Sequence, residues 1–209
     1  MLDVHIAHMQ WDRADWWAEC ELSLRNQPIV VHNIDGIVGD LRQTRFNGYN
    51  CGHYDYVAHV DPDDRVCPGA FAEIIGYLKK HPKCPGVYTM SNRINARGER
   101  IGLMHPYRPW DHNYLLKNIT EVHQITVMRR DIITGLMQKN WDSLPTMGYT
   151  ELVYYAMFAL KHDWTALDLI GYEWRNHKRG VHCNLTQEIQ GGSMQQLIQL
   201  SEQLLLSRK

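Results

Sequence analysis

The alternation of apolar and polar positions predicts that strands and helices follow one another through the first half of the chain. Three short apolar runs, each ending at polar or turn-forming residues, have the pattern of buried strands. They are residues 3–9, 29–32 and 56–60. Ligands of open, largely parallel sheets bind beyond the carboxyl ends of the strands. Asp35 and the acidic residues 61–64 follow or end such runs, so they are candidates for a site.

Two segments between and after these runs carry apolar residues at helical spacing. Trp17, Cys20 and Leu24 predict a helix that starts near Asp12 and ends near Gln27. A second helix follows Pro68, a residue that suits the first helical position. Its apolar face consists of Phe71, Ile74, Ile75 and Leu78. Strands alternating with helices favour an α/β sandwich with a largely parallel sheet.

The second half of the chain has a weaker pattern. Residues 87–90, 125–128 and 164–170 read as strands, and a helix is predicted to open at Thr150-Glu151. A long loop is expected over residues 102–118, and loops of this length often build functional sites. We expect residues 1–190 to form one domain. Residues 191–209 are expected to form an amphipathic helix on it, capped by Ser193 after Gly191-Gly192.

Composition excludes several classes of protein. The 209 residues are 44% hydrophobic and carry a net charge of -1, so no overall field attracts polyanions. The five cysteines are odd in number and never spaced as CxxC, which argues against a disulfide framework or a zinc ribbon. The twelve histidines include no HExxH pattern. With no apolar run of 18 residues, we expect a soluble, cytoplasmic protein.

An acidic cluster, Asp61-Pro62-Asp63-Asp64, directly follows the third predicted strand. Three carboxylates this close repel one another unless water or a cation screens them. Carboxylate oxygens suit Mg²⁺ or Mn²⁺, and substrate phosphates commonly complete the coordination shell of Mg²⁺. The cluster therefore indicates a nucleotide diphosphate ligand bound through a metal. Alternatively, it is a solvated turn whose acids stabilise the start of the next helix.

Several segments in the first half, taken in order, resemble the GT-A glycosyltransferases of the family-two type. Arg13, Ser23 and Gln27 keep the register of the Asn-Arg pair and the Ser-x-x-x-Gln signature of that family. Asp35-Gly36 is similar to the Asp-Asp-Gly-Ser motif, with one acid and the serine lacking. Asn47-Gly48 and residues 55–64 resemble the family's Asn-x-Gly and the strand that enters its acidic motif. The usual Ala-Arg-Asn is missing from the shortened segment between them.

The likeness continues in the second half and covers residues 3 to 182 in all. Residues 127–130 are similar to the strand and basic pair that precede the acceptor-side loop. Residues 148–152 occupy the place of the Glu-Asp motif, in which Leu152 replaces the second acid. Residues 172–177 resemble the Tyr-x-x-Arg-x-His segment of the family.

This resemblance implies a GT-A fold, an α/β/α sandwich with a mixed, mainly parallel sheet. It also implies transfer of a sugar from a nucleotide diphosphate donor, with a UDP-sugar expected, onto an acceptor hydroxyl, as a hexosyltransferase does. Mn²⁺ or Mg²⁺ is the implied cofactor, and Glu151 is the implied base of an inverting reaction. The implied metal ligands are Asp61, Asp63, Asp64 and His177. The implied donor-binding residues are Arg13, Asp35, Asn47, Asp61, Lys178 and Arg179.

Trp110, in the long loop, is a candidate for acceptor contact because aromatic rings stack on sugars. The acceptor itself stays open between a glycan, a protein and a modified nucleic acid base, and so does the oligomeric state. Two alternatives to the transferase also stay open. One is a sugar-nucleotide-binding module that has lost turnover, which Leu152 favours. The other is a sugar-1-phosphate nucleotidyltransferase, although the sequence around Gln10 lacks the glycine-rich loop of that class.

Overall fold

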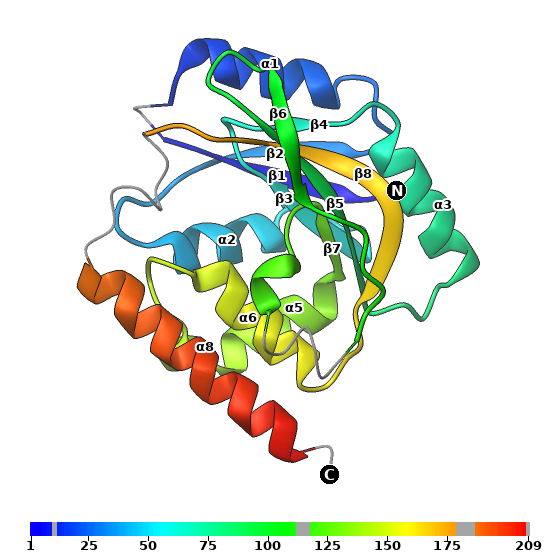
Figure 1. The fold of residues 1–209 in the computed structure, drawn as a ribbon. Helices are drawn as coiled ribbons and strands as arrows, with labels where there is room; N and C mark the ends of the chain where they lie inside the picture. The colour runs from blue at the N-terminus through cyan, green and yellow to red at the C-terminus, as the bar shows by residue number, and fades with distance from the viewer. Residues whose placement is uncertain (10–11, 112–117, 179–186, 208–209) are drawn as a thin grey trace.

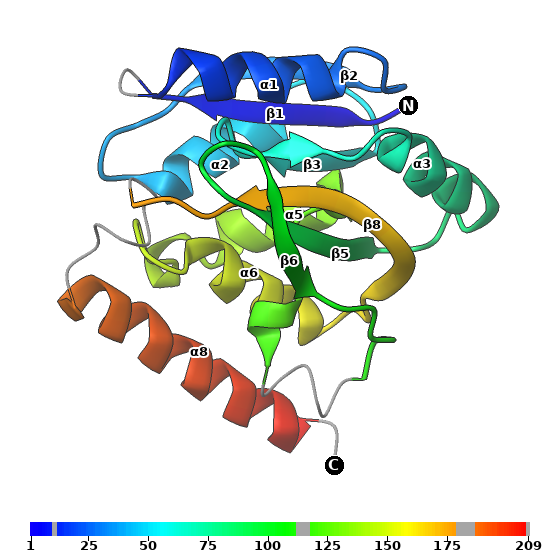
Figure 2. The same ribbon diagram turned by 45° about the horizontal axis from the view of Figure 1, so that its top comes forward.

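A computed structural model describes residues 1–9, 12–111, 118–178 and 187–207 of the chain. Its centre is one mixed sheet of eight strands in the order β2-β1-β3-β7-β5-β8-β4, with β6 paired to β5 (Figures 1 and 2). The strands are β1 (Asp3–His8), β2 (Val30–Asp35), β3 (Tyr56–Val60), β4 (Arg65–Val66), β5 (Gly86–Ile94), β6 (Arg100–His105), β7 (Thr126–Arg129) and β8 (Thr165–Arg175).

The direction of the strands decides where the chain can form a site. β1 pairs in parallel with both β2 and β3, and β5 pairs in parallel with β8. β7 is antiparallel to its two neighbours, β3 and β5. The carboxyl ends of β1, β2 and β3 therefore lie together at one edge of the sheet.

Helices cover both faces of the sheet (Figure 2). They are α1 (Ala14–Leu24), α2 (Leu41–Asn50), α3 (Ala70–Lys80), α5 (Arg130–Lys139), α6 (Thr150–Ala159) and α8 (Gln187–Ser207), with short 3-10 turns η1 (Ile119–Glu121) and η2 (Trp141–Ser143). One core packs α1 and α3 against the sheet, with Phe71 and Ile74 at its centre. The other core packs α2, α5 and α6 against the opposite face. α8 packs against α6 and adds Leu197 and Leu200 to this core.

The structure confirms the predicted α/β fold class and most of the predicted elements. The strands predicted at 3–9, 29–32 and 56–60 are β1, β2 and β3, and the helix after Pro68 is α3. The loop expected over residues 102–118 is partly wrong, because β6 extends to His105. Hydrophobic spacing also did not reveal α2, because its buried face includes the polar residues Thr44 and Arg45.

The predicted start of the last helix is wrong as well. α8 begins at Gln187, so Gly191 and Gly192 lie within the helix and Ser193 does not cap it. Ser193 is instead buried, and its hydroxyl donates to the carbonyl oxygen of Met147 at 3.2 Å. This bond fastens α8 to the segment that leads into α6. Among the helices described, none has both the length and the apolar character needed to span a membrane.

Candidate active site

The carboxyl ends of β1, β2 and β3 bring two of the predicted acids to one edge of the sheet. In the register of the parallel pairs, His8 ends β1 opposite Asp35 of β2, and Asp61 follows the last residue of β3. Neighbouring strands lie about 4.8 Å apart, so β2 and β3 are separated by about 10 Å across β1. Asp35 is exposed at this edge. The spacing suits a ligand that reaches from Asp35 across β1 to Asp61.

The three acids of the 61–64 turn have different surroundings. Asp61 accepts from Arg45 at 2.5 Å and from the side-chain amide of Gln124 at 3.1 Å. Asp63 lies 2.6 Å from the imidazole Nε2 of His177, which follows the end of β8. The turn therefore connects two separate clusters of side chains at the edge of the sheet.

Asp64 is placed differently from the other two acids. It is 1% exposed, and its carboxylate accepts from the backbone N–H of Arg175 at 2.6 Å and from the hydroxyl of Tyr172. Burial, together with the charges of Asp63 and Asp61, raises the pKa of Asp64 well above its usual value. Because these bonds lie inside the fold, Asp64 helps to shape the turn. The structure does not bring it to the accessible surface beside Asp63.

His177 is held against the side chain of Trp16 in α1. The two ring centroids are 4.4 Å apart, and the guanidinium of Arg13 lies 4.2 Å from the centroid of Trp16. Arg13, at the start of α1, is exposed and also donates to Asp15. The structure thus brings Arg13, His177 and Asp63 into one region, although they are far apart in the sequence.

Glu151 lies in the first turn of α6 and points into the same edge of the sheet. Gly148, two residues before the helix, has a φ of +90°, a conformation that favours glycine, and it turns the chain into α6. The carboxylate of Glu151 accepts from Nε of Arg45 at 2.9 Å. Burial raises the pKa of Glu151, and the charge of Arg45 acts against this rise. The same guanidinium therefore contacts the predicted base and Asp61.

Arg45 is the main residue of the site that the sequence analysis did not identify. It is 3% exposed and lies on the buried face of α2 with Gly48 and Tyr49. Although burial opposes its charge, Asp61 and Glu151 raise the pKa of its guanidinium, which stays protonated. An arginine at helical spacing from a glycine and an aromatic residue was the available signal.

Close packing of α2 on β1 sets the position of Arg45. A Cβ atom on Gly48 would lie 2.2 Å from the ring of His5, so no other residue fits there without a shift. Gly48 lies one turn after Arg45, which makes its contact with β1 a determinant of where the guanidinium lies. Asn47 was predicted to bind the donor. In the structure Gly48 serves this packing, while Asn47 is exposed and accepts from Gln43 at 2.7 Å.

A row of buried polar groups continues from Asp61 into the protein. Gln124 lies between Asp61 and Nε2 of His59, which is 3.2 Å from the amide nitrogen of Gln124. The hydroxyl of Tyr49 is 2.9 Å from Nδ1 of His59 and 3.1 Å from the hydroxyl of Tyr154. Burial and the charge of Arg45 lower the pKa of His59 well below its usual value, so its imidazole is neutral. Gln124, supported by these buried groups, holds Asp61 in place on the side that faces the protein interior.

Two other predicted residues lie apart or at the margin. Trp110 donates to Asp163 at 3.1 Å, and Asp163 precedes β8, whereas His177 follows it. Because β8 is 11 residues long, the structure does not bring Trp110 to the acidic turn. Lys178 is exposed next to His177, and Arg179 lies outside the described residues.

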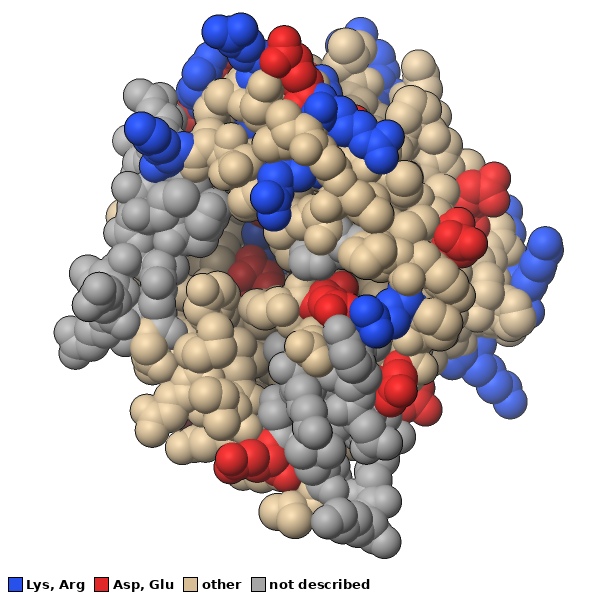
Figure 3. Space-filling view, viewed as in Figure 1, with Lys and Arg blue, Asp and Glu red and all other residues tan. Residues whose placement is uncertain are grey.

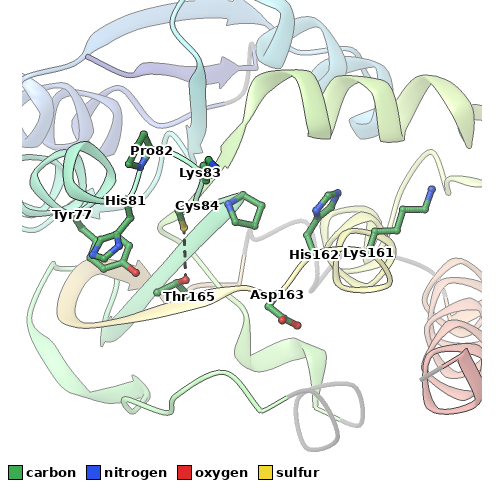
Figure 4. Close-up of a pocket in the computed structure, with 10 residues that line it drawn as sticks. Tyr77, His81, Pro82, Lys83, Cys84, Lys161, His162, Asp163 and Thr165 are labelled. Atoms are coloured by element: carbon green, nitrogen blue, oxygen red, sulfur yellow. Dashed lines mark hydrogen bonds between the residues drawn. The ribbon is translucent and has the colours of Figure 1, made fainter. Parts of the chain in front are cut away.

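The space-filling view shows a hollow left of its centre, toward the side on which β1 and β8 end (Figure 3). Acidic and basic side chains lie inside this hollow. A different, open pocket of about 630 Å³ lies at the amino ends of β5 and β8 (Figure 4). Tyr77 and His81 line one side of it and His162 the other, and none of the predicted site residues lines it. The acidic turn, His177 and Glu151 therefore lie away from this pocket, at the carboxyl ends of the strands.

Within the described part of the chain, no three His, Cys, Asp or Glu side chains are grouped so as to hold a metal ion. The pair Asp63 and His177 nevertheless offers one carboxylate oxygen and one imidazole nitrogen at the same point. Asp63 is 31% exposed and His177 is 7% exposed, so the pair is reached from the side of Asp63. These donors fit a divalent ion whose remaining positions are filled by phosphate oxygens and water.

The structure is similar to solved structures of S. aureus TarS, a GT-A-type family-2 glycosyltransferase. TarS residues 1–349 in complex with UDP-GlcNAc match with a TM-score of 0.69 and 11% identity, over 98% of this chain and 70% of that chain. The complex with UDP matches with a TM-score of 0.67 and 11% identity, over 98% and 65%. The match to the longer TarS structure has a TM-score of 0.60 and 10% identity, over 85% and 37%.

The chain thus spans at most about two thirds of the length of several of these structures. At this low identity the similarity confirms the fold that the sequence analysis predicted, the GT-A fold. No family model and no curated protein matches the sequence.

Proposed function

We propose that the chain is a glycosyltransferase that moves a sugar from a nucleotide diphosphate donor, of the UDP-sugar class, onto an acceptor hydroxyl. The observation that carries this proposal is the joint contact of Asp61 and Glu151 with Arg45 at the carboxyl edge of the sheet. Arg45 thus holds Asp61, an acid proposed to contact the donor, next to Glu151, whose carboxylate suits proton transfer. The presence of UDP-GlcNAc and UDP in TarS structures that match 98% of this chain supports the class of donor.

We assign the donor to the edge that runs from Asp35 to His177. Asp35 at the end of β2 binds the base, and Asp61 binds the ribose. The cationic side chains of Arg13 and Lys178 lie on the side of Trp16 and His177, where they attract the diphosphate. A donor in this orientation places its sugar toward the first turn of α6.

Asp63 and His177 would hold the divalent ion, for which Mn²⁺ or Mg²⁺ is proposed. The ion, when bound, neutralises the negative charge that develops on the diphosphate as the donor bond breaks. Asp61 does not need to be a ligand, because both of its oxygens have partners, Arg45 and Gln124. Asp64 is omitted from the ligand set because its carboxylate is bonded inside the fold.

Glu151 acts as the general base in the proposed reaction. Its carboxylate takes the proton of the acceptor hydroxyl while the acceptor oxygen forms a bond to C1 of the sugar. The bond between C1 and the phosphate oxygen breaks at the same time, and its electron pair leaves with the nucleotide diphosphate. Attack on the face opposite the leaving group inverts the anomeric centre. Burial of Glu151 raises its proton affinity above that of a solvated carboxylate, which suits this step.

A panel of nucleotide sugars, incubated with the protein in the presence and absence of Mn²⁺, tests this function. Release of free nucleoside diphosphate from one donor, faster with an acceptor mixture of glycans than without it, is the expected result. Release of a nucleoside triphosphate on addition of pyrophosphate indicates a nucleotidyltransferase instead. Tight binding of UDP without any turnover of donor indicates a binding module. Either of these last two results rejects the transferase.

A further inference from the structure

We infer that Arg45 is the positioning residue of this site: its guanidinium fixes the carboxylate of Glu151 beside Asp61 and keeps it ready to accept a proton. This inference rests on the proposed function for its catalytic meaning. The contacts of Arg45 with Glu151 and Asp61 do not depend on the proposed function. Arg45 comes from the middle of α2, Asp61 follows β3, and Glu151 starts α6, so one side chain connects three elements.

The geometry of the contacts supports a fixed arrangement. Nε of Arg45 donates to Glu151 at 2.9 Å, and Nη2 of Arg45 donates to Asp61 at 2.5 Å. A planar guanidinium with two of its nitrogens bonded to different carboxylates sets the direction of both. The side chain of Arg45 is only 4% exposed, whereas those of Glu151 and Asp61 are 16% and 26% exposed. The cation is thus deeper than the two acids, which face the ligand side.

The charges around Glu151 explain why Arg45 matters to its protonation. Burial and the nearby charge of Asp61 both raise the pKa of Glu151, whereas the hydrogen bond and charge of Arg45 lower it. Tyr49 of α2 and Tyr154 of α6 also face this cluster, and their raised pKa values keep them neutral. The positive charge opposite Glu151 among these groups therefore comes from Arg45.

The third nitrogen of Arg45 adds a second observation. Nη1 of Arg45 is buried and has no hydrogen-bond partner among the described residues. A buried donor without a partner is costly, and such groups in native proteins commonly await a ligand or water. An oxygen of the bound sugar or of the acceptor is the chemistry that would satisfy it.

Two variants of Arg45 and one matched control test the inference. Arg45→Gln removes the charge, Arg45→Lys keeps the charge but loses the planar fork, and Arg42→Gln makes the same change one turn earlier in α2. Arg42 donates to the carbonyl oxygens of Trp141 and Leu144, away from Glu151. For each protein the titration of Glu151 is followed by carbon-13 NMR of labelled glutamate, assigned with Glu151→Gln. The pH profile of kcat/KM is measured in parallel.

Arg45→Gln is expected to move the Glu151 titration, and the acid limb of the rate profile, up by about 1 to 3 pH units. Arg45→Lys should leave the titration within about half a unit of the wild type and lower kcat at least about tenfold, with donor KM unchanged. Arg42→Gln should change neither. If Arg45→Gln does not fold, Arg45→Lys alone decides, and a wild-type kcat for that variant overturns the inference.

Failure of the inference and failure of the proposed function give different results. An unchanged titration of Glu151 in Arg45→Gln overturns the role of Arg45, whatever happens to the rate. If Glu151→Gln transfers sugar at the normal rate, Glu151 is not the base, and the role of Arg45 in catalysis fails with it. If the Glu151 titration shifts as expected in Arg45→Gln but the wild-type protein turns over no donor, the positioning role of Arg45 stands and the transferase function is rejected.

Discussion

The indole of Trp16 and the imidazole of His177 pack with their centroids 4.4 Å apart, and Trp16 is itself fixed by a 3.2 Å bond from its Nε1 to the carbonyl oxygen of Ala96. His177 follows β8, whereas Trp16 lies in α1, at the other end of the chain. Trp16 is 4% exposed, so its ring has little freedom to move. Partners that orient a metal-binding histidine commonly affect the affinity for the ion.

Replacing Trp16 therefore should weaken binding of the metal. We expect Trp16→Leu to raise the Kd for Mn²⁺ in the presence of UDP about 10- to 100-fold, because His177 loses its support beside Asp63. Trp16→Phe, which keeps an aromatic ring, should have a smaller effect. Electron paramagnetic resonance of free Mn²⁺ measures both, and Trp141→Leu serves as a control away from Asp63. An unchanged Kd in Trp16→Leu, with the fold intact, would show that Trp16 does not orient His177 for binding of the ion.

The proposed roles of Asp63 as a metal ligand and of Glu151 as the base predict opposite effects on UDP binding and on turnover. Asp63→Asn should weaken UDP binding at least about tenfold when Mn²⁺ is present and leave binding without metal unchanged, since a neutral amide is a poorer ligand. Calorimetric titration of UDP with and without Mn²⁺ makes this comparison. Equal UDP affinities of variant and wild type in Mn²⁺ would remove Asp63 from the site.

Glu151→Gln should give the reverse pattern. We expect UDP binding at the wild-type level and transfer slower by about 10²- to 10⁴-fold, because the amide cannot take a proton from the acceptor. Initial rates at saturating donor, compared with the calorimetric Kd for UDP, separate the two effects. A loss of UDP binding equal to the loss of rate would point to a structural role for Glu151.

The close contact between α2 and β1 makes a prediction about stability. Gly48→Ala places a Cβ 2.2 Å from the ring of His5, and His5 is buried with little room to shift. We expect a loss of about 1 to 3 kcal/mol in the free energy of unfolding. Gly76→Ala in α3 is the matched control, because nothing lies within 4 Å of its new Cβ. It should stabilise the protein by about 0.4 to 1 kcal/mol. Urea denaturation gives both values.

A buried ion pair at the other end of β1 predicts a pH dependence of stability. Burial raises the pKa of Asp3, but hydrogen bonds from His32 and from the N–H of Tyr54, with the charge of Arg130, lower it below its usual value. A lowered pKa stabilises the folded state above about pH 4, and this contribution is lost as the pH falls through the folded-state pKa. Asp3→Asn should thus cost about 3 to 5 kcal/mol at pH 7 and clearly less near pH 3.

Urea denaturation of both proteins at several pH values measures the difference. Asp131→Asn is the control, because Asp131 is also paired with an arginine, Arg129, but its side chain is 65% exposed. This variant should cost no more than about 1 kcal/mol. A constant difference between Asp3→Asn and wild type from pH 7 to pH 3 would contradict the assignment.

The sequence predicted the fold better than it predicted the contacts within the site. Apolar spacing was sufficient for β3 and for α3, because the buried residues of α3 are apolar and those of β3 are apolar apart from His59. It could not identify α2, whose buried face includes a charged arginine that is satisfied only by residues distant in the sequence. Arg45 was missed for the same reason, since its helical spacing from Gly48 and Tyr49 is a weak local signal and its partners Asp61 and Glu151 lie elsewhere in the sequence.

The acidic turn shows a second limit of the sequence analysis. Asp63 and Asp64 are adjacent and chemically identical, and the sequence alone offered both as ligands. Their surroundings differ because Tyr172 and Arg175 of β8 bond Asp64 inside the fold, whereas His177 meets Asp63. These partners lie more than 100 residues downstream, and only the pairing of β4 with β8 brings them to the turn.

The bond between Ser193 and Met147 couples the segment before α6 to the last helix. Met147 precedes Gly148 and the first turn of α6, and Leu197 and Leu200 cover the core behind that turn. Removing α8 by ending the chain before Gln187 would uncover this apolar patch and release the segment that leads into α6, at whose start Glu151 lies. A truncated protein that still binds nucleotide but no longer transfers sugar would be the signature of such uncoupling.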